Sequence, residues 1–133
     1  MRVKNVKVII NRDAIAQLNK AKESALELTA EAMRADIVSR AVVPKDTGQL
    51  EQGSEKYKSG YVEQVKEFVY AIVYDTLYAR RWYFNLDGAT FQKTKNHDAQ
   101  DHWMDYYLDG EGKRWIIDTY CKFLRQESGG LIK

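Results

Sequence analysis

The hydrophobic positions change their spacing along the chain, and each spacing predicts a different element. Val6, Val8 and Ile10 recur at a period of two, which predicts a strand over residues 3–10. From Ala14 to about Val42 the spacing alternates between three and four residues, which predicts one helix about 40 Å long. The chain therefore opens with a strand and continues into an unusually long helix.

The apolar stripe of this helix is mostly alanine, and Asn11 or Asp13 can cap its first turn. Such a stripe usually faces the core of its own domain, here by lying across a sheet, and a seam between two molecules is the alternative. Small side chains allow either neighbour to approach closely. The stripe consists of Leu18, Ala21, Ala25, Leu28, Ala32 and Ala35.

The middle of the chain changes to strand patterns. Pro44 is predicted to end the long helix, because its ring is incompatible with a helix interior. The polar stretch 49–60 predicts either a flexible arm or an exposed hairpin. Residues 61–65 and 68–74 are rich in β-branched and aromatic side chains and predict two strands, the second typical of a strand buried on both faces.

The last third alternates turns with helical patterns. Residues 86–96 are rich in turn-forming side chains, a short helix is expected from about Ala99, and a final helix is expected from Lys113 to Gln126. Residues 128–133 indicate a frayed tail. Residues 1–133 are thus predicted to form a single α+β domain, with a long N-terminal helix packed on a small antiparallel sheet and a C-terminal helical segment.

Composition narrows the function classes. A chain of 133 residues can bury a core without disulfides, and its single cysteine, Cys121, excludes an internal one. A net charge of +2 is too small for general electrostatic binding of nucleic acid. The sequence shows no signal peptide and no apolar run long enough to span a bilayer. We therefore expect a protein made in a cytoplasm, with no membrane contact.

Candidate chemistry is sparse. The segment from His97 to His102 could offer imidazole and carboxylate ligands at helical spacing, but it matches no established metal pattern. A capped, solvated helix start explains the same residues better. Cys121 lies in an amphipathic pattern that favours a buried structural thiol, and no serine or glycine motif supplies a nucleophile or a phosphate loop. We expect no enzyme, no cofactor and no metal.

The basic pair Arg80-Arg81 lies between Tyr78 and Trp82 and allows three interpretations. A strand with core aromatics and solvated arginines is the simplest. A protein interface is the second, because tryptophan, tyrosine and arginine dominate interface hot spots. Stacking on nucleic-acid bases is the third, weakened by the absence of a wider basic patch.

An ordered set of short motifs resembles a known family. Val43-Pro44-Lys45-Asp46-Thr47-Gly48-Gln49-Leu50, directly after the alanine-rich helix, resembles the VPxDTGxL signature of tailed-phage minor capsid and head–tail joining proteins. A strand ending Val73-Tyr74-Asp75-Thr76, then Tyr78-Ala79-Arg80-Arg81 and a late segment with Trp103 and Trp115, follow in the order of that family. Many members have a glycine near the end of the central strand, and this chain has none there.

The resemblance implies a non-enzymatic virion subunit of the neck, assembled in the bacterial host cytoplasm. Its expected partners are other copies of itself in a ring, the phage portal or connector, and tail proteins. A tail-completion subunit and a module in passing contact with DNA are the alternatives. The residues expected at assembly contacts are Pro44, Asp46, Thr47, Gly48, Leu50, Tyr78, Arg80, Arg81 and Trp82. In particular, the polar arm 49–60 and the segment 78–84 are expected to make these contacts.

Overall fold

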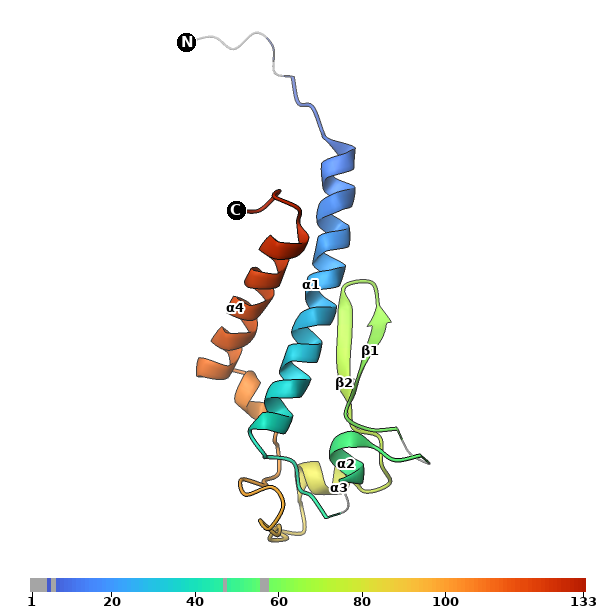
Figure 1. Cartoon of the computed structure of the whole chain (residues 1–133), viewed down its shortest axis with the longest axis vertical. Helices are drawn as coiled ribbons and strands as arrows, with labels where there is room; N and C mark the ends of the chain where they lie inside the picture. Colours follow the sequence, from blue (N-terminus) through green and yellow to red (C-terminus); the bar gives the residue numbers. More distant parts are fainter. Residues whose placement is uncertain (1–4, 6, 47, 56–57) are drawn as a thin grey trace.

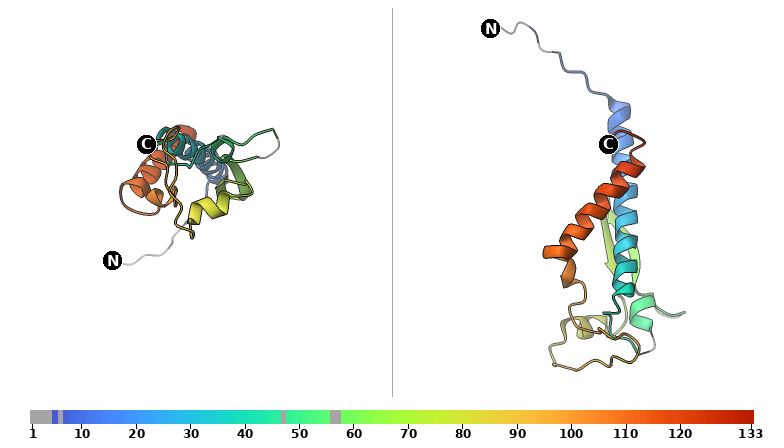
Figure 2. Two further views of the ribbon diagram at one scale, coloured as in Figure 1. Left: turned by 90° about the horizontal axis from the view of Figure 1, so that it is seen from below. Right: turned by 60° about the vertical axis from the view of Figure 1, so that its left-hand side comes forward.

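The computed structural model describes residue 5 and residues 7–46, 48–55 and 58–133. Its axis is the long helix α1 (Arg12–Ser39), with helix α4 (Gly110–Glu127) on one side and the hairpin of β1 (Tyr61–Lys66) and β2 (Val69–Val73) on the other (Figure 1). The segments that connect α1, the hairpin and α4 gather at the C-terminal end of α1. The molecule is elongated, and α4 runs obliquely along α1 (Figure 2). The predicted α+β fold, with its long N-terminal helix, antiparallel sheet and C-terminal helix, is confirmed.

Helix α1 begins at a side-chain cap and buries a narrow stripe. The Oδ1 atom of Asn11 accepts a hydrogen bond from the Ala14 amide at 3.0 Å, as a cap should. The fully buried positions of this helix include two of the predicted alanines, and Thr29 rather than Leu28 continues the stripe; they are Ala21, Ala25, Thr29 and Ile37. Their spacing of four residues, and of eight between the last two, keeps them on one face.

The end of α1 differs from the prediction. The helix stops at Ser39, with Arg40 as its C-cap, five residues before the proline expected to end it. Ala41 takes a left-handed conformation with φ 53°, which turns the chain so that Val42 and Val43 enter the core. Burial of these two valines, rather than the proline ring, therefore sets the boundary.

The hairpin is antiparallel, with Tyr61 opposite Val73 and a register shift between Gln64 and Lys66. Both predicted strands are confirmed, although β2 is only partly buried rather than buried on both faces. At its turn Phe68 has φ 60°, and its amide donates to the Glu23 carboxylate at 2.6 Å. The tip of the hairpin is thereby fixed to the middle of α1.

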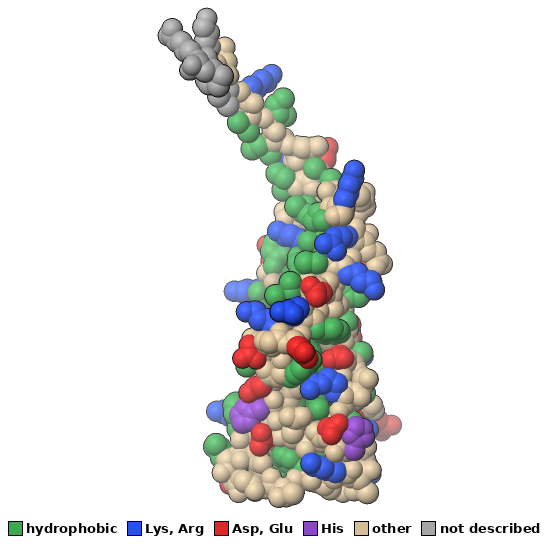
Figure 3. Space-filling view, turned by 90° about the vertical axis from the view of Figure 1, so that its left-hand side faces the viewer, with side chains coloured by type: hydrophobic (Ala, Val, Ile, Leu, Met, Phe, Trp, Pro, Cys, Tyr) green, Lys and Arg blue, Asp and Glu red, His purple; other side chains and the backbone are tan. Residues whose placement is uncertain are grey.

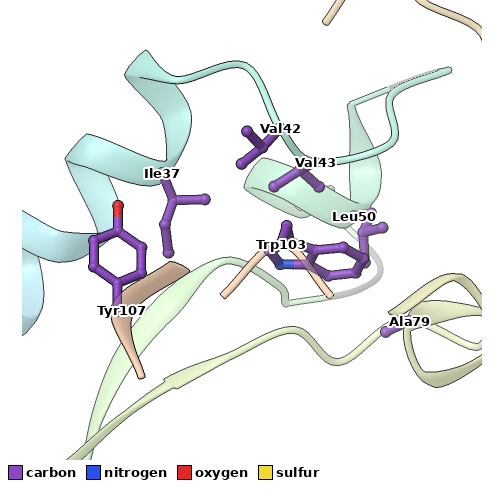
Figure 4. Close-up of a cluster of buried hydrophobic side chains, with 7 residues drawn as sticks. All are labelled: Ile37, Val42, Val43, Leu50, Ala79, Trp103 and Tyr107. Carbon is purple, nitrogen blue, oxygen red and sulfur yellow. The ribbon is translucent and has the colours of Figure 1, made fainter. Parts of the chain in front are cut away.

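The main hydrophobic core lies at the C-terminal end of α1. Trp103 is buried there beside Val42, Val43 and Leu50 (Figure 4), and its ring meets Tyr74 edge-on with centroids 5.4 Å apart. The whole cluster consists of Ile37, Val42, Val43, Leu50, Ala79, Trp103 and Tyr107. The end of α1 thus shares one core with segments from the middle and the last third of the chain.

Three tyrosines around this core are held in their protonated form. Burial, more than any nearby carboxylate, raises the pKa of Tyr74 to about 12. Burial and a hydrogen bond to Asp105 raise the pKa of Tyr83, and burial and a hydrogen bond to Asp36 raise the pKa of Tyr107. The neutral phenol is the form that these sites accept.

These shifts predict a loss of stability in alkali. A tyrosine in the unfolded chain ionises at about pH 10, so the folded state binds more protons above that pH and its free energy of unfolding falls as the pH rises further. Below that pH the tyrosines are protonated in both the folded and the unfolded state, so they do not make the free energy of unfolding depend on pH. Urea unfolding of the wild type and of Tyr74→Phe, followed over this alkaline range, should give a shallower fall for the variant. Because lysines titrate in the same range in both proteins, parallel curves would contradict the assignment.

The C-terminal residues are partly packed. Ser128 is fully buried, and its carbonyl accepts a hydrogen bond from the Gln17 side chain at 2.7 Å. Its hydroxyl accepts from the Ile132 amide at 3.1 Å. The predicted frayed tail is therefore anchored at its first residue, near the start of α1, because α4 brings it there.

The N-terminal strand is not formed over the described part of its range. Residues 7–10 have no regular structure, and the other residues of the predicted strand, apart from Asn5, lie outside the described part. Val8, Ile9 and Ile10 are exposed. A period-two pattern supplies an apolar face but not a neighbouring strand, and none is adjacent here. Within the described residues, no helix is long and apolar enough to cross a membrane.

Candidate interaction site

A groove of about 610 Å³ lies at the lower end of the molecule in Figure 1, between three segments distant in sequence. They are residues 44–50, residues 76–82 and residues 89–92. The lining residues are Pro44, Lys45, Asp46, Gly48, Gln49, Leu50, Thr76, Leu77, Tyr78, Trp82, Ala89, Thr90, Phe91 and Gln92. We call this surface the motif groove, because the family-like motif forms one wall.

A buried polar junction sets the position of the motif wall. The Glu51 side chain is only 1% exposed, and its Oε2 atom lies 3.1 Å from Lys45 Nζ. The Asn96 amide donates to the Val43 carbonyl at 2.8 Å and to Glu51 Oε1 at 3.3 Å. A charge so far from water needs such partners. The junction therefore fixes the chain on both sides of residues 44–50.

The segment expected to be a polar arm is largely fixed at its ends. Residues Gln49–Gln52 form the short helix α2, which begins at Gly48 with φ 87°, and it buries Leu50. Ser59 Oγ donates to the Leu50 carbonyl at 2.6 Å and accepts from the Asp75 amide at 3.2 Å. Of the described residues between these anchors, Ser54, Glu55 and Lys58 are exposed. The arm is therefore a short exposed loop with buried ends.

Asp46 links the motif wall to the third wall of the groove. Its Oδ1 atom accepts from Gln92 Nε2 at 3.2 Å, and the same nitrogen donates to the Lys45 carbonyl at 3.0 Å. The Lys95 ammonium donates to the Asp46 carbonyl. These bonds hold the 89–92 wall against the motif wall. Thr47 lies outside the described residues.

The second wall is a helix, not the strand expected for residues 78–84. Helix α3 (Ala79–Phe84) places Ala79, Trp82 and Tyr83 toward the interior, three and four residues apart. A strand would have sent alternate residues to opposite faces, which does not match this set. Trp82 then packs edge-on against Phe91, with ring centroids 5.7 Å apart, and joins the second wall to the third.

The two arginines lie on the outer side of α3. Arg81 Nε is 3.0 Å from Asp87 Oδ2, and its guanidinium lies 5.4 Å from the Trp82 ring. Arg80 is exposed and its guanidinium lies 5.9 Å from the Phe84 ring. The arginines are therefore near the motif groove but face away from its described lining.

The structure thus brings together six of the nine predicted site residues: Pro44, Asp46, Gly48, Leu50, Tyr78 and Trp82. Leu77, Phe91 and Gln92 also line the groove, although no sequence pattern selected them. Leu77 is 78% exposed and adjoins the exposed Tyr78. Its exposure depends on the tertiary fold, so no local pattern could indicate it.

The groove is suited to holding side chains of another protein. Pro44, Leu50, Trp82 and Phe91 supply apolar surface, and Leu77 and Tyr78 stand exposed at its side. Apolar pockets rimmed by polar side chains accept aromatic or aliphatic anchors of a partner.

The His97–His102 segment forms no metal site. His97 Nδ1 pairs with Asp98 at 2.8 Å and His102 Nδ1 with Asp101 at 3.1 Å, each with its own neighbour in sequence. The segment is not helical, so the expected spacing of four residues does not bring them together. In the described part of the chain, no group of three or more histidine, cysteine, aspartate or glutamate side chains could hold an ion.

Comparison of the chain with protein-family models, with curated proteins and with solved structures gives no match.

Proposed function

We propose that this protein is a structural subunit of a tailed-phage neck, which joins the head connector to the tail as part of an oligomeric ring. The observation that carries the proposal is the motif groove. The family-like motif and the Tyr-Ala-Arg-Arg element are separated by about thirty residues in the sequence, yet Pro44 and Leu50 of the motif and Tyr78 of the element line one surface. A single contact with a partner protein would explain why two motifs that resemble one family lie on the same surface.

The chemistry of this surface supports a protein contact rather than catalysis. Leu77 and Tyr78 are exposed next to an apolar groove, and large side chains exposed in this way usually mark interaction sites. The same surface would serve a tail-completion subunit, which is the nearest alternative. Contact with DNA is less favoured, because Arg81 is already paired with Asp87.

One pair of substitutions tests the role of the groove. Leu77→Asp should prevent the joining of heads to tails, because it places a charge where a partner is expected. Leu86→Asp is the matched control, since Leu86 is 95% exposed and is not among the lining residues described for the groove. Both variants should stay within about 0.5 kcal/mol of the wild-type free energy of unfolding, because both leucines are exposed.

The measurement is complementation of a phage from which the gene has been deleted. Electron microscopy should show filled heads and separate tails in the deletion and with Leu77→Asp, and joined particles with the wild type and Leu86→Asp. Normal particles in the deletion would overturn the neck role, and normal particles with Leu77→Asp would overturn the assignment of the groove.

A further inference from the structure

Residues 7–10, which we call the arm, lie outside the body of the molecule. Val8, Ile9 and Ile10 are 78%, 80% and 65% exposed. Figure 3 shows hydrophobic side chains along the segment that leads from α1 toward the N-terminus. Residues 1–12 carry four basic side chains and no acidic one. Three adjacent β-branched side chains in water are costly to maintain, which indicates that something covers them in the assembled state.

A second groove has the complementary character. It has a volume of about 450 Å³ and lies between α1, the hairpin and α4. Its lining is almost wholly hydrophobic: Leu26, Thr29, Ala30, Met33, Phe68, Val69, Tyr70, Ile116, Ile117 and Tyr120. The one small polar side chain, Thr29, donates its hydroxyl to the Ala25 carbonyl at 2.6 Å and so offers little polarity. We call this the helix groove.

Charge at the hairpin side of the helix groove suits a basic occupant. The Tyr70 hydroxyl donates to Glu23 Oε2 at 3.0 Å, and Glu27 is also close enough to interact electrostatically with this tyrosine. The Lys22 ammonium lies 4.8 Å from the Phe68 ring centroid. Glu23, Glu27 and Lys22 together carry a net charge of −1. The chain before α1 carries Arg2, Lys4 and Lys7 and no acidic residue, and its positive charge is attracted to such a rim.

The arm cannot fill the helix groove of its own chain. Leu26 lies fourteen residues into α1 from Arg12, which is about 21 Å along the helix axis. An extended chain covers at most about 3.6 Å per residue, so Val8 reaches about 14 Å back from Arg12 and Ile10 about 7 Å. The exposed apolar residues of the arm therefore stop short of the groove in the same molecule.

We propose that the arm of one copy, centred on Val8–Ile10, lies in the helix groove of a second copy. Such a contact joins two different surfaces, so it can repeat from copy to copy in a ring or an open chain, or be made twice in a pair that exchanges arms. The arm contact is separate from the proposed neck role, which concerns the motif groove at the other end of the molecule. If a ring forms, the arm contact would join its subunits.

Disulfide trapping tests the contact directly. In a Cys121→Ala background, a tagged Ile9→Cys variant is mixed with an untagged Val69→Cys variant under mild oxidation. The expected product is a mixed dimer, resolved on a non-reducing gel. The control is Ile9→Cys mixed with Leu86→Cys, because Leu86 is more exposed than Val69 and random collision would favour it. Equal yields from the two pairs, or no mixed dimer with Val69→Cys, would overturn the proposal.

Solution mass supplies a second readout. Light scattering across a concentration series should give an oligomer for the wild type and a monomer for the triple variant Val8→Ser, Ile9→Ser, Ile10→Ser. At concentrations low enough for the wild type to dissociate, the two proteins should have the same melting temperature, because the three side chains are exposed in the single copy and contribute little to its fold. A wild type that stays monomeric at every concentration, or a triple variant that keeps the wild-type mass, would refute the arm contact. Trapping that succeeds while the gene deletion still gives normal particles would retain the contact and reject the neck role.

Discussion

Replacing Gly60 by alanine should destabilise the protein by about 4 kcal/mol or more, enough to unfold a domain of ordinary stability. Gly60 has φ +63°, a conformation that side chains other than glycine rarely adopt. A Cβ at this position would lie 2.7 Å from the Glu51 carbonyl carbon and closer still to its oxygen. Both obstructing atoms belong to the backbone, so no side-chain rotation can relieve the overlap.

The backbone around Gly60 cannot easily move either. Its amide donates to the Val73 carbonyl at 2.7 Å, which closes the base of the hairpin. The preceding residue, Ser59, bonds to both Leu50 and Asp75. Any shift that makes room for a methyl group must therefore break hydrogen bonds of buried groups, each of which costs about 1–3 kcal/mol to leave unsatisfied.

Gly88→Ala is the matched control for this prediction. Gly88 has a similar φ of +67°, but no atom of the described residues lies within 4 Å of the position its Cβ would take. That variant should lose only the conformational cost, about 1–2 kcal/mol. Urea unfolding followed by circular dichroism measures both. Equal losses in the two variants would mean that φ alone, and not the contact with α2, requires glycine at position 60.

The contact between Gly60 and Glu51 also shows where sequence reasoning stops. Helix α1 could be predicted from its spacing of three and four residues, and the two strands of the hairpin from their β-branched and aromatic side chains. The stretch 49–60 has no period, and its polar composition indicated an exposed arm. Its buried Glu51 finds a partner in Asn96, and its buried Ser59 finds one in Asp75. Local sequence patterns do not predict contacts between residues so far apart in the chain.

The candidate site residues could also be predicted only in part from local patterns. The family-like motifs selected both Pro44 and Trp82 without indicating that they lie on one surface. Trp82 reaches the groove because α3 is a helix, and six residues rich in aromatics and arginine do not distinguish a helix from a strand. At the N-terminus a clear pattern predicted an element that is not formed. The alternation of Val6, Val8 and Ile10 predicts a strand, but a strand needs a neighbour, and none of the described strands pairs with residues 7–10.

Removing Lys45 should be the second most damaging change, because it isolates a buried carboxylate. Lys45→Met should cost about 3 kcal/mol, since Glu51 would keep only its long hydrogen bond from Asn96 at 3.3 Å. The lysine side chain is 27% exposed, so water can replace it in part, and the estimate stays at the lower end of the range for broken buried pairs. The motif wall of the groove should loosen with it, since this pair links residue 45 to α2.

A double-mutant cycle separates the pair from the loss of either side chain. Lys45→Met combined with Glu51→Leu removes both charges and should recover a large part of the lost stability, because no unpaired charge remains in the core. Arg81→Met is the control: it breaks an ion pair of nearly the same length, 3.0 Å, whose side chains are 59% and 64% exposed. It should change the free energy of unfolding by about 0.5 kcal/mol or less. Similar losses from Lys45→Met and Arg81→Met would show that burial of Glu51 does not govern the strength of the junction, and that the motif wall is held mainly by Asn96 and Gln92.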